Sequence, residues 1–205
     1  MVTTTLSAQS TPVEAVDDEP RLVISALEEG GFQVRATLRV AAPPRVVWSV
    51  LTDCGQAMNY VPGMRRCEVL ESGPGYEVVV HKIRRHALLP ALDYVFRSDY
   101  QPWSRISTQL LKGDLRQLHG EWRFEPCAAD CTLLSYDFVA EARWYVSRRR
   151  ERKALQSDVP EMLRRLREQS LAQWRMEQEA RSAEESRQAN SEDGESSSAN
   201  DTASN

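Results

Sequence analysis

Five aromatic residues are the strongest candidates for chemistry in this sequence. They lie at every second position of residues 92–100, 115–125 and 132–142, and they are Tyr94, Phe96, Trp122, Tyr136 and Phe138. Such spacing puts side chains on one face of a β-strand. Charged residues occupy many of the positions between them. This aromatic face suits either a filled core or the wall of a pocket for an apolar molecule, and both readings stay open.

A pocket of this kind also needs a few polar groups to orient its ligand. The hydroxyls of Tyr94, Tyr136 and Thr108 lie at positions that fit this role. Met162 and Leu166 belong to an apolar stripe in a predicted C-terminal helix, so we expect them to close the same pocket. For any one of these side chains, a place in the core is the commoner outcome.

Two basic clusters could contact an anionic surface. In KIRRHALLPAL at 82–92, Arg84 and Arg85 lead into Leu88 and Leu89, a combination that suits transient docking on an anionic membrane. The alternative is a loop folded inward under the C-terminal helix. The second cluster, RRRERK at 148–153, begins with two arginines. Arg148 and Arg149 suit phosphates of a membrane or of ribosomal RNA, or else form the solvated start of a helix. We expect no DNA partner.

Catalysis finds little support in the sequence. The three histidines share no metal-ligand spacing, and no nucleophile, phosphate-loop or Cys/His motif occurs. Asp53 and Asp114 are expected at a helix end and a turn, where carboxylates usually cap backbone N–H groups. Only Tyr94, Tyr136 and Arg143 remain as acid–base candidates. We therefore predict no catalytic residue, no metal and no cofactor.

The redox state of the four cysteines depends on the cellular compartment of the protein. Cys54, Cys67, Cys127 and Cys131 form no CxxC pair, although the last two could meet across a hairpin turn. No apolar run approaches the length of a membrane span, and the N-terminus lacks the basic and apolar regions of a secretory signal. These features favour a cytoplasmic location, where the four cysteines would be free thiols.

Charge divides the chain into a body and two tails. Residues 1–20 carry four acidic and no basic residues, and residues 181–205 carry six acidic and two basic residues. Such segments cannot offset their ordering entropy. We therefore predict disordered tails at 1–20 and 179–205 around one domain at 21–178.

Hydrophobic periodicity predicts mostly strands in that domain. The expected strands are 22–27, 32–40, 65–72, 76–84, 92–100, 105–111, 115–125 and 132–142, separated by short turns that require antiparallel pairing. Val47, Val50 and Leu51 indicate a short helix after Pro43 and Pro44, followed by a second short helix near 56–60.

A sheet with one apolar face needs a cover, and a helix from about residue 148 supplies it. Its apolar stripe consists of Leu155, Val159, Met162, Leu163 and Leu166. Pro160 lies within this stripe, so we expect a kink or break near residues 157–160.

Four segments in this order resemble the START-like (SRPBCC, helix-grip) superfamily, most of all its polyketide cyclase/dehydrase and coenzyme Q-binding members. They are AAPPRVVWSVLTD at 41–53, YVPGM at 60–64, KGDL at 112–115 with GEWRF at 120–124, and DVPEML at 158–163. Cys54 departs from the aromatic residue that often follows the first segment.

The resemblance implies an α+β fold in which a curved antiparallel β-sheet wraps around a long C-terminal α-helix, with two short helices after the first strands. It also implies binding or carriage of a hydrophobic small molecule, such as a lipid, a quinone or another isoprenoid or polyketide-like ligand, in an internal cavity. The alternatives are a cyclase/aromatase-type enzyme and a module that associates with a ribosome or another protein through its basic C-terminal helix.

Overall fold

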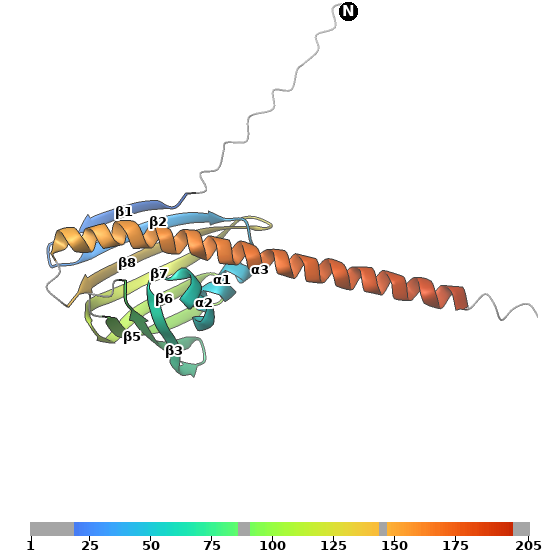
Figure 1. The fold of residues 1–205 in the computed structure, drawn as a ribbon, viewed down its shortest axis with the longest axis horizontal. Coiled ribbons are helices and arrows are strands. Elements are labelled where there is room, and N and C mark those ends of the chain that lie inside the picture. Colours follow the sequence, from blue (N-terminus) through green and yellow to red (C-terminus); the bar gives the residue numbers. More distant parts are fainter. Residues whose placement is uncertain (1–18, 86–90, 144–146, 199–205) are drawn as a thin grey trace, which may run out of the picture.

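The computed structural model describes residues 19–85, 91–143 and 147–198. One antiparallel sheet of eight strands dominates it, in the order β1-β2-β8-β7-β6-β5-β4-β3 (Figure 1). The strands are β1 (Arg21–Ala26), β2 (Phe32–Val40), β3 (Met64–Gly73), β4 (Tyr76–Ile83), β5 (Leu92–Gln101), β6 (Arg105–Gly113), β7 (Leu115–Ala128) and β8 (Cys131–Ala142). All eight predicted strands are present, with ends that differ by a few residues at most.

Two short helices fill the link between β2 and β3. Helix α1 (Pro44–Thr52) starts with a proline in its first turn, where the missing N–H has no intrahelical partner to lose. Helix α2 (Cys54–Tyr60) follows at once, because the Asp53 carboxylate accepts a hydrogen bond from the Gly55 backbone N–H at 2.7 Å. This cap is the role expected for Asp53.

Helix α3 (Arg148–Ser198) lies across the concave side of the sheet and extends well beyond it (Figure 1). It continues through Pro160, so of the predicted kink or break near residues 157–160 the break is wrong. Val159, Leu163 and Leu166 on either side of the proline are all buried in the same core. Their packing holds both halves of the helix on one path despite the missing backbone hydrogen bond.

Helix α3 also differs from expectation at its C-terminal end. The sequence predicts a disordered tail from residue 179, whereas α3 runs on to Ser198. Ser182 and Ser186 each donate a hydrogen bond to the carbonyl four residues earlier. Residues 179–188 consist mainly of Glu, Ala, Arg and Gln, which favour helix without any packing partner. The predicted N-terminal tail lies almost wholly outside the described residues.

The core lies where β2 and β8 meet α1 and α3. Its fully buried side chains include Phe32, Leu38, Val47, Leu134 and Leu163. This packing of one long helix on a curved antiparallel sheet is the helix-grip fold of the START-like superfamily, as predicted. No helix of the described ranges is both long and apolar enough to cross a membrane.

Two disulfide bonds overturn the prediction of free thiols. Cys127 and Cys131 pair across the β7–β8 turn with Cα atoms 5.1 Å apart, and Cys54 pairs with Cys67 at 5.3 Å. Both separations suit a disulfide. The first pair is brought together by the hairpin, and the second by the packing of α2 on β3. The prediction failed because it relied on an assumed reducing compartment. The cytoplasmic location itself remains a prediction.

Candidate ligand-binding cavity

A cavity of about 1190 Å³ lies between the concave sheet face, the short helices and the first turns of α3. Its volume slightly exceeds the range usual for drug-sized ligands. Side chains from α1, α2, α3 and strands β3 to β8 line it. The aromatic sheet face is therefore hollow on this side of the molecule, while the filled core lies at the β2 end.

A stack of three aromatic rings forms one wall. Trp122 on β7 and Tyr136 on β8 are cross-strand partners whose ring centroids lie 3.6 Å apart with planes at 4°. Phe138 continues the stack at 4.3 Å from Tyr136. Gly120 makes room for it, since a Cβ there would lie 2.5 Å from the Phe138 Cβ. The result is a flat apolar surface in the cavity wall.

A second aromatic cluster comes from β4 and β5. The His81 ring contacts Phe96 edge-on at a centroid distance of 4.7 Å, and Tyr94 lies 5.6 Å from His81 and 5.8 Å from Phe96. His81 and Tyr94 are cross-strand partners, which explains their proximity. This cluster and the three-ring stack belong to different strand pairs of the same sheet.

The sequence-predicted ligand residues fall largely in this cavity. Those that line it are Tyr94, Phe96, Thr108, Trp122, Tyr136, Phe138 and Met162. Leu166 does not line it, because that side chain is fully buried in the core. Within the stripe of α3, the first turns face the cavity and the turn that holds Leu166 faces the filled core.

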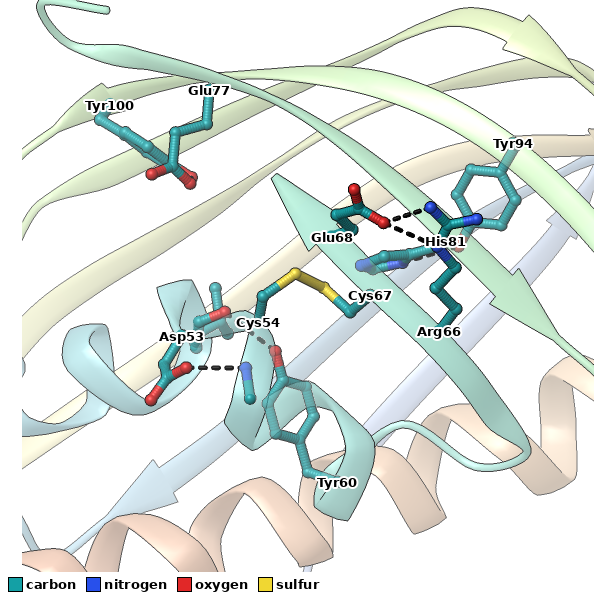
Figure 2. Close-up of a disulfide and its surroundings, with 12 residues drawn as sticks. Asp53, Cys54, Tyr60, Arg66, Cys67, Glu68, Glu77, His81, Tyr94 and Tyr100 are labelled. Atoms are coloured by element: carbon teal, nitrogen blue, oxygen red, sulfur yellow. Dashed lines mark hydrogen bonds and ion pairs between the residues drawn. A yellow bond between two sulfur atoms is a disulfide. The ribbon is translucent and has the colours of Figure 1, made fainter. Parts of the chain in front are cut away.

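Three tyrosines within the cavity wall make hydrogen bonds. The Tyr60 hydroxyl donates to the Leu51 carbonyl at 2.9 Å. The Tyr100 hydroxyl donates to the Glu77 carboxylate at 2.9 Å, and the Tyr94 hydroxyl lies 3.3 Å from His81 Nδ1 (Figure 2). Burial raises the pKa of all three phenols above the usual value, so they are protonated at neutral pH.

Two further polar groups of the cavity wall are uncharged at neutral pH. Burial lowers the pKa of His81 to about 4, so its imidazole is neutral at pH 7. Burial also raises the pKa of the Tyr136 phenol, so this group is protonated.

Several of these groups were not among the candidates. Glu77 and His81 occupy alternate positions of β4 together with Val79 and Ile83, and all four line the cavity. That alternation was a usable signal in the sequence. Tyr60 offered no such signal, because a short helix shows too few residues to define a buried face. No three described His, Cys, Asp or Glu side chains lie close enough together to hold a metal ion.

The Cys54–Cys67 disulfide forms part of the cavity wall. Cys54 begins α2, Cys67 lies on β3 opposite His81, and all three line the cavity. Figure 2 shows the disulfide joining the helix to the strand, with His81 and Tyr94 on the neighbouring strands. The bond thus ties α2 to the edge strand of the sheet.

The candidate docking residues lie in different surroundings. Arg85 lines the cavity and contacts Asp158 at 2.6 Å and Glu161 at 3.3 Å. Arg84 is exposed, and Leu88 and Leu89 lie outside the described residues.

At the start of α3, Arg148 donates a hydrogen bond to the Leu27 carbonyl at 2.6 Å, and Arg149 is exposed. Arg148 thus holds the start of α3 close to the segment that follows β1. Arg150 and Lys153, which follow in the first two turns of α3, line the cavity.

Comparisons with solved structures show the same fold. TTHA0849 from Thermus thermophilus has 21% identity and a TM-score of 0.61, over 68% of this chain and 97% of that one. The Zhui aromatase/cyclase from a Streptomyces species has 25% identity and a TM-score of 0.56, over 67% and 92%. The human StarD13 lipid transfer and protein localization domain has 15% identity and a TM-score of 0.65, over 75% and 85%.

A search of curated proteins finds no match. The family model described as "Polyketide cyclase / dehydrase and lipid transport" matches residues 40–167, which is more than half of the chain. The matched range starts at the end of β2, spans the rest of the sheet and ends within α3. The chain therefore belongs to this family of the START-like superfamily.

Proposed function

We propose that this protein binds and carries a hydrophobic small molecule in its cavity. The observation that carries this proposal is a space of about 1190 Å³ lined by two groups of aromatic side chains. Each 100 Å² of apolar ligand surface removed from water contributes roughly 2.5 kcal/mol. A lipid, a quinone or another isoprenoid or polyketide-like molecule has enough apolar surface to be retained in such a space. The family description includes lipid transport and supports this class.

A cyclase or aromatase activity is the second candidate. The similarity to the Zhui aromatase/cyclase favours it, as does the placement of His81 and Tyr94 inside the cavity. The low pKa of His81 weakens the argument for an enzyme, since a histidine with a pKa of about 4 is a poor base at pH 7. Turnover of a polyketide-like substrate that is lost in Tyr94→Phe would favour the enzyme. Membrane contact through residues 84–89 and ribosome or protein association through residues 148–149 remain predictions.

The carrier proposal is tested by extraction. The protein is purified from the cells that make it, denatured, and its organic extract is analysed by mass spectrometry. We expect one apolar compound at close to one molecule per chain. An empty extract, together with no thermal shift from added lipids or quinones, contradicts the proposal.

Two variants connect the extracted compound to the cavity. Phe96→Asp and Phe138→Asp each place a charge in the apolar wall, so both should abolish ligand retention. Leu133→Asp is the matched control, because Leu133 is an exposed residue on the same strand as Phe138 and does not line the cavity. Full retention in folded Phe96→Asp and Phe138→Asp variants would show that the ligand binds elsewhere.

A further inference from the structure

The hydrogen-bonded pair of His81 and Tyr94 stands out within the apolar cavity. The two residues are cross-strand neighbours on β4 and β5, both line the cavity, and Nδ1 of one lies 3.3 Å from the hydroxyl oxygen of the other (Figure 2). Phe96 packs against the His81 ring, so this pair is set in an aromatic surface. Polar groups inside a pocket that is otherwise apolar usually orient a ligand.

Both members of the pair are uncharged at neutral pH, as their shifted pKa values show. If Nδ1 accepts the tyrosine hydrogen, the imidazole keeps an N–H at Nε2. If Nδ1 carries the hydrogen and donates it to the phenol oxygen, the tyrosine O–H is left to donate. In either tautomer the pair has one hydrogen for a further acceptor.

The charges nearby disfavour an anion at this position. Glu77 lies on the same strand and the same cavity-facing side as His81, and its carboxylate accepts the Tyr100 hydroxyl. Arg85 lies as far from His81 along the chain as Glu77 does, but its charge is already paired with Asp158 and Glu161. The other cations that line the cavity, Arg150 and Lys153, lie in the first turns of α3. A neutral acceptor fits the pair better than a carboxylate or a phosphate.

We infer that His81 and Tyr94 form a donor subsite for an uncharged oxygen acceptor, above all a carbonyl oxygen, on an otherwise apolar ligand. This inference rests on the proposed carrier function and narrows its ligand class. A carbonyl accepts a hydrogen bond without bringing a donor that would itself need a partner. A conjugated ketone or quinone also brings a planar ring system, which suits the adjacent aromatic walls.

Two model compounds separate recognition of the carbonyl from apolar binding. The first is 9-fluorenone, and the second is fluorene, which has the same ring system without the carbonyl. Affinities are measured by equilibrium dialysis for the wild type, Tyr94→Phe and His81→Phe. Each variant should bind 9-fluorenone about three- to tenfold more weakly, the range expected for one lost hydrogen bond, with the fluorene affinity changed less than twofold.

The matched control is Tyr76→Phe. Tyr76 also lies on β4 and its hydroxyl also makes a hydrogen bond, to the Glu71 carboxylate, but it does not line the cavity. This variant should bind both compounds as the wild type does. A third compound, the anionic fluorene-9-carboxylate, should bind the wild type at least tenfold more weakly than 9-fluorenone.

The outcomes distinguish the inference from the function on which it rests. If both neutral compounds bind but neither Tyr94→Phe nor His81→Phe weakens 9-fluorenone more than fluorene, the donor subsite is refuted and the carrier function stands. Equal binding of the carboxylate refutes the preference for a neutral acceptor. If neither neutral compound binds the wild type and the native extract is empty, the carrier function fails and the inference fails with it. Tyr94→Phe removes the phenol donor and His81→Phe removes the imidazole donor, so the two variants together cover both tautomers, and a selective loss of 9-fluorenone binding in either supports the subsite.

Discussion

At the scale of single residues, the cavity combines apolar rings with a few neutral polar groups. His81 is the one imidazole among the described residues that line it, and its low pKa follows from burial beside Phe96 and Tyr94. The tyrosines remain protonated for the same reason. His81 and the tyrosines thus offer uncharged hydrogen-bond donors, while the cations of the cavity wall lie at Arg85 and in the first turns of α3. This separation supports recognition of a polar but uncharged group beside His81 and Tyr94.

Burial of His81 also predicts a pH dependence of stability. In the unfolded chain the pKa of this histidine is near 6.5, and in the fold it is about 4, so between these values the unfolded state binds the extra proton. The free energy of unfolding therefore rises with pH in this window and falls on acidification. When the pH falls from 7 to 4.5, the free energy of unfolding should decrease by roughly 1–3 kcal/mol more in the wild type than in His81→Gln, as measured by chemical denaturation. Parallel pH profiles for the two proteins would refute the buried, neutral histidine.

At the scale of elements, the Cys54–Cys67 bond connects α2 to β3 on the cavity wall, whereas Cys127–Cys131 only closes the β7–β8 turn. Both bonds restrict the unfolded chain, and the longer loop restricts it more. The two disulfides therefore form a natural comparison. They contribute to stability in similar ways, but only one of them borders the proposed site.

Replacing each pair of cysteines by serines tests this difference. The Cys54/Cys67 double variant should lose about 3 kcal/mol of unfolding free energy and the Cys127/Cys131 variant about 2 kcal/mol. Only the first should weaken binding of 9-fluorenone, because only that bond holds the cavity wall. Denaturation curves measure the unfolding free energy, and equilibrium dialysis on the same samples measures the binding of 9-fluorenone. A binding loss of equal size in the two variants would argue against the wall role.

Helix α3 makes a second prediction at this scale. Pro160 lacks the N–H that an interior helical residue donates, and tertiary packing offsets this loss. Pro160→Ala should therefore raise the free energy of unfolding by about 1–3 kcal/mol. Pro44→Ala is the control, since Pro44 lies in the first turn of α1 and should change stability little. A destabilised Pro160→Ala protein would mean that packing of the proline ring contributes more than the backbone hydrogen bond.

At the scale of the whole molecule, the domain is complete before α3 ends. Two side-chain links join the middle of α3 to the body: Gln173 donates to Ser49 at 2.8 Å, and Glu177 pairs with Arg45 at 2.6 Å. Trp174 packs partly against the core, whereas residues 182–188 are exposed. The distal part of the helix therefore adds little to the fold.

Truncation locates that boundary. A chain ending at residue 182 should keep its melting temperature within about 2 °C of the full chain, because substitutions of exposed residues such as those at 183–188 rarely matter by more than about 0.5 kcal/mol. A chain ending at residue 170 loses Trp174 and both links, so it should melt at least about 5 °C lower. Calorimetry on the three proteins decides the matter. A large decrease in melting temperature on truncation at residue 182 would mean that the distal part of α3 belongs to the folded unit.

The sequence alone determined the strand order along the chain, the two short helices, the apolar sheet face and the family resemblance. These features depend on local periodicity, turn residues and short motifs, which act over a few neighbouring positions. They were enough to select seven of the residues that line the cavity. They also predicted the cap formed by Asp53.

Tertiary structure alone decided the rest, because each remaining feature depends on residues far apart in the chain. Alternation is the same for a hollow sheet and a filled one, so the cavity appears only when α3 is placed over the sheet. The core packing that carries α3 through Pro160, the pairing of Cys54 with Cys67 and the burial of Leu166 away from the cavity all follow from that placement. The His81–Tyr94 pair likewise exists only through the register of β4 against β5. Sequence patterns record which face of an element is apolar, and packing decides what that face meets.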